Sequence, residues 1–402
     1  MKILHTADWH LGKRLQGFNR IDEQRQVLHE IVKIADREQV NAVLIAGDLF
    51  DTYNPLTEAI ELFYSTLHQL SNYGTRAVVA IAGNHDSAER IEAPHPLAAN
   101  CGIVLFGLPD TVIKPFSLPS GLAVVKSEAG YLELNLPGIN YPFRLILTPY
   151  ANEVTFKKFL GKDRPQDQLR KLLASNWKNL ASKYFDKQGV NLLMAHLYFM
   201  SKGAPGPEED DDEKSILFQG GAQAVFTEDL PDSIQYTALG HLHRPQEIPA
   251  DHPVIYCGSP LSYSFSEADQ QKQVEIIEAE PGKPVKRRTI RLKTGKKLTR
   301  QRFEDIDGAV NWLEDHPDTY VELTIVADDY LGAKEKQRLY KAHKGIVAII
   351  PELKTSAVQN DKLDSIDLSK DLKSLFVEYF KFRKGQKPDP KLLEIFDEII
   401  HQ

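Results

Sequence analysis

Five short polar motifs constrain this chain more than any other feature, because each one directly follows an apolar run of strand length. The motifs are Asp8-Trp9-His10, Gly47-Asp48, Gly83-Asn84-His85-Asp86, Ala195-His196 and Gly240-His241-Leu242-His243. Short runs rich in Val, Ile, Leu and Ala are typical of strands that are buried on both faces. In open α/β sheets, functional groups gather just past the carboxyl ends of such strands. The pattern therefore predicts an α/β fold with one site assembled from five loops.

The residue types in these motifs predict a pair of divalent cations. The expected ligands of one ion are Asp8, His10, Asp48 and His243, and those of the other are Asp48, Asn84, His196 and His241. The shared carboxylate would then bridge two ions, which two-metal hydrolases hold roughly 3.5–4 Å apart. No Cys belongs to the set, so a structural zinc or iron–sulfur site is disfavoured. Mixed oxygen and nitrogen ligands suit Mn, Fe or Zn better than Mg.

One histidine of the motifs is not assigned to a metal. His85 is expected to donate a hydrogen bond or a proton to the leaving oxygen of a phosphate ester. Asp51, three residues after the bridging Asp48, is placed to orient His85. A single motif of this kind more often belongs to a turn with a satisfied histidine. Five in series, each behind a buried strand, favour a real site.

The same residues resemble the motifs of the calcineurin-like metallophosphoesterases. Within that superfamily, residues 3–12 (ILHTADWHLG) and 238–243 (ALGHLH) resemble the DNA double-strand-break repair nucleases, in particular the nuclease subunits of bacterial SbcCD-type complexes. The resemblance covers nearly the whole chain and is most specific in its N-terminal two thirds. It implies a two-sheet metallophosphoesterase sandwich flanked by helices, with Mn²⁺ as the expected metal. Its further implications are a small α/β capping domain and a C-terminal helical tail.

The resemblance also implies what the protein acts on and works with. The expected activities are 3′-to-5′ exonuclease action on double-stranded DNA and endonuclease action on single strands and hairpins, in DNA recombination, replication and repair. The chain has no Gly-x-x-x-x-Gly-Lys-Ser/Thr phosphate loop, so ATP dependence would have to come from a second polypeptide. The partner implied is an SbcC-type SMC-like ATPase, in a heterotetramer that contains a homodimer of this chain.

A chain of 402 residues exceeds the usual size of one domain, so several domains are expected. We predict a metallophosphoesterase nuclease domain over 1–280, a capping, DNA-binding domain over 281–355, and a linker with a partner-docking tail over 356–402. Amphipathic spacing predicts helices over 21–39 and 57–71 that pack on the first sheet.

The formal net charge of −7 does not favour a protein that coats DNA by itself, so DNA binding would need a local basic surface. The candidate phosphate contacts are Lys13, Arg14 and Arg20 beside the first motif, and Arg287, Arg288 and Arg291 in the basic stretch 286–302. A solvated loop and a solvated strand face explain these two groups equally well. The acidic run 208–213 is expected to be a solvated loop, and a gate over the DNA is the alternative.

Two cysteines exclude a disulfide framework and favour a reducing cytoplasm, where such a nuclease would meet the nucleoid. No apolar run approaches the roughly 18 residues that span a bilayer. Near the C-terminus, two stripes at helical spacing predict a docking hairpin for the ATPase, and packing on the chain's own body is the alternative. The residues of these stripes are Leu372, Leu375, Phe376, Tyr379 and Phe380, then Phe396 and Ile399.

Three functions remain open on the sequence alone. The first is a metal-dependent DNA nuclease subunit. The second is a phosphomonoesterase or small-molecule phosphodiesterase on the same scaffold, although a compact phosphatase needs neither the capping unit nor the tail. The third is a catalytically silent scaffold, which would usually lack some ligands, whereas all seven positions and His85 are filled here.

Overall fold

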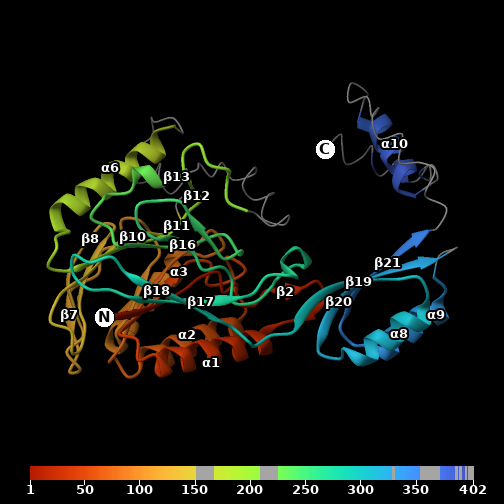
Figure 1. Ribbon diagram of the computed structural model, residues 1–402, viewed down its shortest axis with the longest axis horizontal. Helices are drawn as coiled ribbons and strands as arrows, with labels where there is room; N and C mark the ends of the chain where they lie inside the picture. The colour runs from red at the N-terminus through yellow and green to blue at the C-terminus, as the bar shows by residue number, and fades with distance from the viewer. Residues whose placement is uncertain are drawn as a thin grey trace.

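A computed structural model describes residues 1–150, 167–208, 225–327, 331–353 and 372–384, together with positions 388, 392, 393 and 396. The chain forms a large body of two packed sheets, a smaller α/β cap beside it and a helix near the C-terminus (Figure 1). The strand orders of the two large sheets are β18-β17-β1-β4-β5-β6 and β15-β16-β14-β11-β10-β9-β8-β7. The predicted two-sheet sandwich is confirmed.

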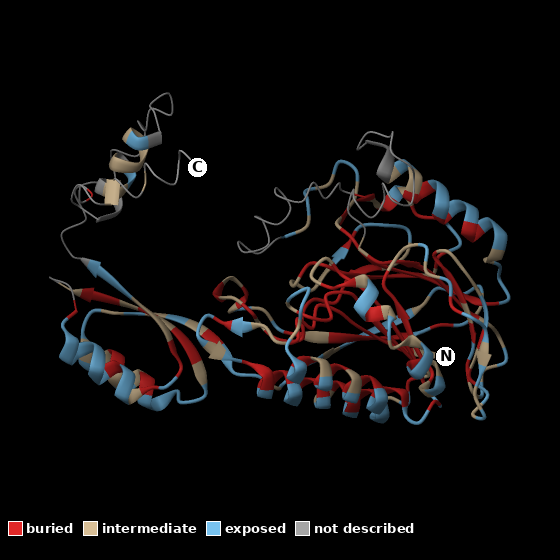
Figure 2. Ribbon diagram, turned by 180° about the vertical axis from the view of Figure 1, so that it is seen from behind, coloured by how far each residue is buried: buried red, intermediate tan, exposed pale blue. Residues whose placement is uncertain are grey.

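The first sheet is built around parallel strands that are buried along almost their whole length. These strands are β1 (Lys2–Thr6), β4 (Ala42–Ala46), β5 (Ala77–Ile81) and β6 (Ile103–Phe106), and β17 (Gln273–Glu278) and β18 (Lys286–Arg291) extend the sheet in antiparallel fashion. The predicted helices form as α1 (Ile21–Arg37) and α2 (Thr57–Ser71) and cover the outer face. Figure 2 shows that each helix buries one side and exposes the other.

The second sheet carries the later motifs. Its strands are β7 (Phe116–Ser117), β8 (Ala123–Glu128), β9 (Tyr131–Asn135), β10 (Phe143–Thr148), β11 (Val190–His196), β14 (Tyr236–Gly240), β15 (Gln246–Ile248) and β16 (Val254–Tyr256). Helix α6 (Asp167–Tyr184) packs on its outer face through Trp177. Between the sheets, apolar side chains such as Leu44, Leu145 and Leu192 form the central core. Strand β6 pairs with β5 and so belongs to the first sheet.

Short elements connect these layers. They are β2 (Arg14–Leu15), β3 (Phe18–Asn19), α3 (Ala88–Glu92), α4 (His95–Ala98), η1 (Ala99–Cys101), β12 (Phe199–Met200), β13 (Val225–Phe226), η2 (Thr227–Asp229) and η3 (Phe265–Glu267). Among the described residues, no helix is both long and apolar enough to cross a membrane.

The cap has its own core. Its strands β19 (Lys297–Phe303), β20 (Thr319–Ala327) and β21 (Ile346–Leu353) are parallel, and helices α8 (Ile306–Asp315) and α9 (Ala333–Ala342) pack against them through Leu313, Leu323 and Leu339. The predicted boundary at 281 is too early, because β18 pairs with β17 in the body along its whole length. The Pro281-Gly282 pair is the turn of that hairpin, and the cap starts at β19.

In the tail, helix α10 (Leu372–Lys384) forms where the first apolar stripe predicted it. The ring of Phe376 stacks on that of Phe396 with centroids 4.0 Å apart, so the two stripes contact each other. Phe380 lies 5.9 Å from Phe376, and Tyr379 is 52% exposed. Of the other tail residues, Leu375 is half-buried, while Ile399 and the side chain of Leu372 lie outside the described residues.

Candidate metal centre

The five polar motifs meet at one end of the packed sheets, where β1, β4, β5, β11 and β14 all end. Four non-glycine residues in these loops have a left-handed backbone. The φ angles are 53° at Asp8, 44° at His10, 47° at Asp48 and 109° at His241. Positive φ is uncommon outside glycine, and such residues cluster at functional sites because the surrounding structure must hold them.

Main-chain hydrogen bonds hold neighbouring loops in register. The amide of Asp8 donates to the carbonyl of Gly47 at 3.0 Å, and the amide of His10 donates to the carbonyl of Asp48 at 2.9 Å. Across the sheets, the amide of His241 donates to Oδ1 of Asp8 at 2.9 Å. Gly83 is required by space, because a Cβ there would lie 2.1 Å from Oδ1 of Asp48.

One group of predicted ligands gathers around His10. Its Nε2 lies 3.4 Å from Oδ2 of Asp48 and 2.9 Å from Nε2 of His243. Asp8 is fully buried beside this group. Asp8, His10 and Asp48 bring one potential ligand atom each within 4.8 Å of one another.

The second group gathers around Asn84. Its Oδ1 lies 3.0 Å from Nε2 of His196 and 3.0 Å from Nδ1 of His241. Nε2 of His196 is also 3.4 Å from Oδ2 of Asp48. That single carboxylate oxygen is therefore equally far from a nitrogen in each group. The structure brings together all seven residues that the sequence proposed as metal ligands.

These residues fit a pair of divalent cations. Oδ2 of Asp8 and Nδ1 of His10 are buried without a hydrogen-bond partner, which is costly unless a ligand compensates. Burial raises the pKa of Asp8 to about 7. Burial opposes protonation of His196, but the charges of Asp48 and Asp8 outweigh it and raise its pKa to about 9. A bound cation would favour the ionised carboxylate and the neutral imidazole at these positions, because carboxylate and imidazole ligands bind metals in their deprotonated forms.

His85 stands beside the metal ligands. Its main-chain N–H donates to Oδ1 of Asp48 at 3.0 Å, and its Nδ1 lies 2.9 Å from the main-chain carbonyl oxygen of Asp51. The sequence predicted that Asp51 orients His85, and the contact is made by this carbonyl. The Asp51 carboxylate instead lies 3.0 Å from Nζ of Lys13 and 3.7 Å from Nδ1 of His10.

Asp86 supports the loops, a role that its place in the third motif did not reveal. Its carboxylate accepts hydrogen bonds from the amides of Gly83 at 2.7 Å, Leu49 at 3.0 Å and Phe50 at 2.9 Å. Burial, together with the charge of Asp48, raises its pKa to about 6. Asp86 thereby fastens the loop after β5 to the loop after β4.

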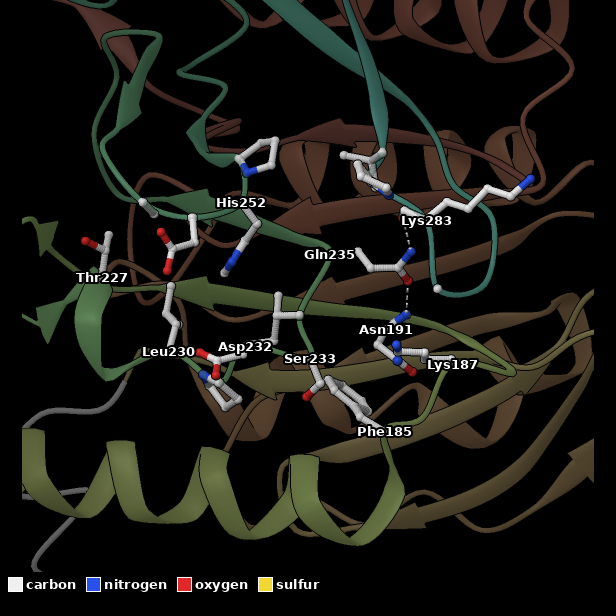
Figure 3. A pocket seen from close by; sticks show the side chains of 18 of the residues that line it. Phe185, Lys187, Asn191, Thr227, Leu230, Asp232, Ser233, Gln235, His252 and Lys283 are labelled. Atoms are coloured by element: carbon white, nitrogen blue, oxygen red, sulfur yellow. Dashed lines mark hydrogen bonds between the residues drawn. The ribbon is translucent and has the colours of Figure 1, made fainter.

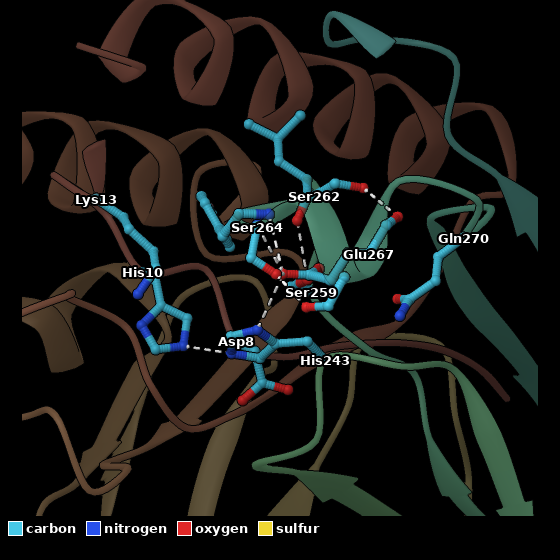
Figure 4. A network of polar contacts seen from close by, with 12 residues as sticks. Asp8, His10, Lys13, His243, Ser259, Ser262, Ser264, Glu267 and Gln270 are labelled. Carbon is cyan, nitrogen blue, oxygen red and sulfur yellow. Dashed lines mark hydrogen bonds and ion pairs between the residues drawn. The ribbon is translucent and has the colours of Figure 1, made fainter. Parts of the chain in front are cut away.

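Sequence reasoning missed the wall of the centre formed by residues after β16. The ring of Tyr263 meets His10 edge-on at 5.7 Å, and its hydroxyl donates to the carbonyl of Trp9. Glu267 is buried with Oε1 3.5 Å from Nδ1 of His243 (Figure 4). Burial would raise the pKa of Glu267, but Lys272 and His243 hold it well below its usual range. No motif marks these residues, because they follow a turn and lie about 20 residues or more past His243, the last histidine of the five motifs.

The structure separates the basic residues predicted to contact DNA into those that remain candidates and those that do not. Lys13 lies beside Asp51, and Arg14 is exposed with its guanidinium donating to the carbonyl of Gly17. Arg291 is exposed at the end of β18. These three remain candidates for contact with phosphate.

Arg20 is not a candidate, because its side chain is fully buried. Its guanidinium donates to both carboxylate oxygens of Glu23, at 2.8 and 2.9 Å, and to the carbonyl of Ser262 at 3.0 Å. It also lies over the ring of Tyr320, 5.0 Å from the centroid, and the Tyr320 hydroxyl donates to Glu23 at 2.8 Å. Arg20 thus fastens the body to the cap.

Arg287 and Arg288 are also poor candidates, because carboxylates of the body hold them. Arg287 lies 2.7 Å from Glu247 and 3.4 Å from Glu275, and Arg288 lies 2.5 Å from Glu38. Glu38 follows α1 and precedes β4, so it lies at the end of the sheet opposite to Asp48.

A cavity of about 880 Å³ lies at that opposite end, close to the starts of β11, β14 and β16 (Figure 3). Asn191, Gln235, His252 and Lys283 are among its lining residues. None of the seven predicted metal ligands lines it. The cavity is therefore separate from the metal centre.

The acidic run is described only at Glu208, whose carboxylate lies 2.6 Å from Arg244, next to the predicted ligand His243. Positions 209–213 lie outside the described residues, so the predicted loop or gate stays a prediction.

Known proteins resemble this chain over most of its length. Residues 1–245 match the calcineurin-like phosphoesterase family. The sequence is 36% identical to SbcD, the nuclease component of the SbcCD complex, from Bacillus subtilis, over 99% of this chain and 97% of that protein. Proteins of the same name from Rhodobacter capsulatus and Staphylococcus epidermidis are 32% and 29% identical, over 70% and 74% of this chain and 67% and 71% of their own lengths. The Bacillus similarity includes the cap and the tail.

Proposed function

Since the chain belongs to the calcineurin-like phosphoesterases and, within them, to the SbcD nuclease family, we propose that it is the nuclease subunit of an SbcCD-type complex. As a member of this family, it is a metal-dependent hydrolase of phosphodiester bonds. The observation that best supports the proposal is the position of Asp48 Oδ2, 3.4 Å from a nitrogen of both His10 and His196. We propose the seven ligands named above for two ions, with Mn²⁺ as the metal.

Two bound ions would supply a phosphoryl clamp and a hydroxide nucleophile near neutral pH. The chain's own contribution centres on His85. The carbonyl of Asp51 can only accept, so Nδ1 of His85 must be the donor in that contact. Nε2 is then the other ring nitrogen, and it can donate a proton to the leaving oxygen of the substrate only while the ring carries a proton on both nitrogens. Asp51 acts by fixing the ring, and its carboxylate positions Lys13.

The proposed substrate is DNA, with 3′-to-5′ exonuclease action on duplexes and endonuclease action on single strands and hairpins. Because the chain as a whole is acidic, backbone phosphates need local positive charge. Lys13 beside the centre, and Arg14 and Arg291 on the surface, are the side chains proposed to provide it. The cap, seated on the body through Arg20 and Tyr320, is proposed as the second wall of the DNA channel.

The proposed partner is an SbcC-type SMC-like ATPase that binds the tail. The stacked rings of Phe376 and Phe396 support this, because they join the two apolar stripes of the tail while Tyr379 stays exposed. Within the complex we propose two copies of this chain in a heterotetramer, acting in the cytoplasm on nucleoid DNA. Tyr53 and Leu56, which both precede α2, are exposed large apolar side chains and are proposed to take part in the contact between copies.

The test is cleavage of an end-labelled DNA duplex with Mn²⁺, with and without the partner ATPase and ATP. A chromogenic phosphomonoester is assayed in parallel. We expect DNA degradation that EDTA and His85→Ala both abolish, and that His29→Ala, an exposed histidine of α1, leaves intact. Monoester turnover with undegraded DNA under every condition would instead establish a phosphomonoesterase.

A further inference from the structure

The segment from Gly258 to Lys272, here called the support loop, touches a proposed metal ligand on one side and the cap on the other. On the metal side lie Tyr263 and Glu267, beside His10 and His243. On the cap side, Phe265 packs with an apolar cluster that includes residues of β19 and β20. The loop is therefore held in place by contacts that are independent of the metal.

Glu267 is the centre of a polar network within this loop (Figure 4). Its Oε1 accepts hydrogen bonds from the amides of Tyr263 at 3.0 Å and Ser264 at 3.1 Å, and its Oε2 accepts one from Ser259 at 3.2 Å. Nζ of Lys272 lies 2.5 Å from Oε2 and also donates to the carbonyl of His243 at 3.1 Å. These contacts fix the carboxylate and the main chain of His243 relative to each other.

Glu267 lies at one nitrogen of the His243 ring, and the other nitrogen faces His10 and the proposed metal centre. Nδ1 of His243 points to Oε1 of Glu267 at 3.5 Å, while Nε2 lies 2.9 Å from Nε2 of His10. A neutral imidazole carries a proton on one nitrogen and a lone pair on the other. A carboxylate facing Nδ1 favours the proton there and leaves the lone pair on Nε2, toward the proposed ions. Carboxylate–histidine pairs orient metal ligands in this way in many metalloproteins.

We propose that Glu267 is the positioning residue of His243, which holds that ring with Nε2 presented to the metal ion on the His10 side of Asp48. The proposal rests on the proposed function only for the identity of the ligands. If Glu267 had only a structural role, it would stabilise the support loop without affecting the affinity of one ion more than that of the other.

The experiment measures Mn²⁺ binding calorimetrically in the wild type, Glu267→Gln, Glu267→Ala, His243→Ala and the double variant Glu267→Gln/His243→Ala. Glutamine keeps the shape and removes the charge. We expect Glu267→Gln to weaken the binding of one of the two ions about 10- to 100-fold, and Glu267→Ala to weaken it further. The other ion should bind as it does in the wild type. In the His243→Ala background, Glu267→Gln should have no additional effect, because the ring that it positions is gone.

The matched control is Glu275→Gln, which changes a carboxylate of equal burial in β17 that bonds to Thr289 at 2.7 Å and to Arg287. It should bind both ions as the wild type does. A second readout needs no metal: in ¹⁵N-histidine spectra of the metal-free protein, His243 should carry its proton on Nδ1, and Glu267→Ala should shift this population toward Nε2.

Wild-type affinity for both ions in Glu267→Gln and Glu267→Ala would overturn the inference. Equal weakening of the binding of both ions would also overturn it, as would a further loss of Mn²⁺ affinity when Glu267→Gln is added to His243→Ala. A wild-type protein that binds no pair of ions would overturn the proposed metal centre itself, a separate and recognisable result.

Discussion

The Nε2 atoms of His10 and His243 lie 2.9 Å apart, although the two residues follow strands of different sheets. Two imidazole lone pairs at this distance repel each other unless a proton or a cation lies between them. A metal ion at this position would therefore join the loop after β1 to the loop after β14, and metal binding should be linked to folding.

The first prediction follows from that linkage. Mn²⁺ at about 100 times its Kd should stabilise the protein by about 2.7 kcal/mol, because a ligand that binds only the folded state shifts unfolding by mass action. Differential scanning calorimetry with Mn²⁺ and with EDTA measures the effect. His10→Ala should lose most of it and His29→Ala none. An equal Mn²⁺ effect in His10→Ala would contradict the ligand assignment.

The second prediction separates His85 from the metal ligands. His85→Asn keeps a side-chain amide that can donate to the carbonyl of Asp51 but cannot transfer a proton. We expect kcat on DNA to fall by about 10²–10⁴-fold, a typical contribution of a general acid. Metal content measured by elemental analysis should stay at the wild-type value. Loss of metal from this variant would show that His85 is a ligand.

The third prediction concerns Gly83. A Cβ at this position would lie 2.1 Å from Oδ1 and 2.2 Å from the amide nitrogen of Asp48, so the shared carboxylate would have to move. Gly83→Ala should therefore lose both ions and the nuclease activity. Gly17→Ala is the matched control, because a Cβ there meets nothing within 4 Å. Normal Mn²⁺ binding by Gly83→Ala would be inconsistent with this geometry.

The fourth prediction is that Arg20 contributes to the stability of the fold and that Arg14, an exposed residue, does not. Arg20→Ala leaves the buried carboxylate of Glu23 without its charged partner, which costs about 3–5 kcal/mol in comparable buried pairs. Thermal unfolding should show a lower midpoint for Arg20→Ala and a wild-type midpoint for Arg14→Ala. Hydrogen exchange should also rise at the seam around Tyr320. A wild-type midpoint for Arg20→Ala would refute this role.

The fifth prediction is a pH dependence of stability that comes from His5. Burial lowers the pKa of His5 to about 3, although the hydrogen bond to the Leu239 carbonyl acts in the opposite direction. In the unfolded chain the pKa is about 6.5, so between these values the unfolded state binds the additional proton. The stabilisation is complete above pH 6.5 and is lost as the pH falls toward 3, at about 1.4 kcal/mol per pH unit.

Denaturant titrations at pH 6.5, 5.5 and 4.5 check this dependence. His5→Gln removes the titrating group and keeps a donor and an acceptor for its neighbours Tyr236 and Leu239. It should show a shallower loss of stability on acidification than the wild type. Identical slopes in the two proteins would mean that His5 does not carry the effect.

The sequence was sufficient to predict that the ligands meet in one site, because each ligand directly follows a strand along the chain. Asp48 follows an uninterrupted apolar run, and the parallel neighbours of that run carry Asp8 and Asn84 to the same sheet edge. No tertiary information was needed to place these three together.

The missed features depend on contacts between distant segments. Glu267 reaches His243 only because the support loop folds back, and its local sequence shows an ordinary turn. Arg20 looks like an exposed basic residue until the cap residue Tyr320 closes over it. Pro281 marks a composition change, but hydrogen bonding between β17 and β18 makes it a hairpin.

The spread of the metal centre along the chain determines when during synthesis it can form. Asp8, His10, Asp48 and Asn84 leave the ribosome early, but His241 and His243 come only after β14 of the second sheet, and the support loop comes later still. A nascent or prematurely terminated chain can thus hold four of the seven proposed ligands and lack the others. Hydrolysis that needs both proposed ions would therefore be withheld until translation has passed β14.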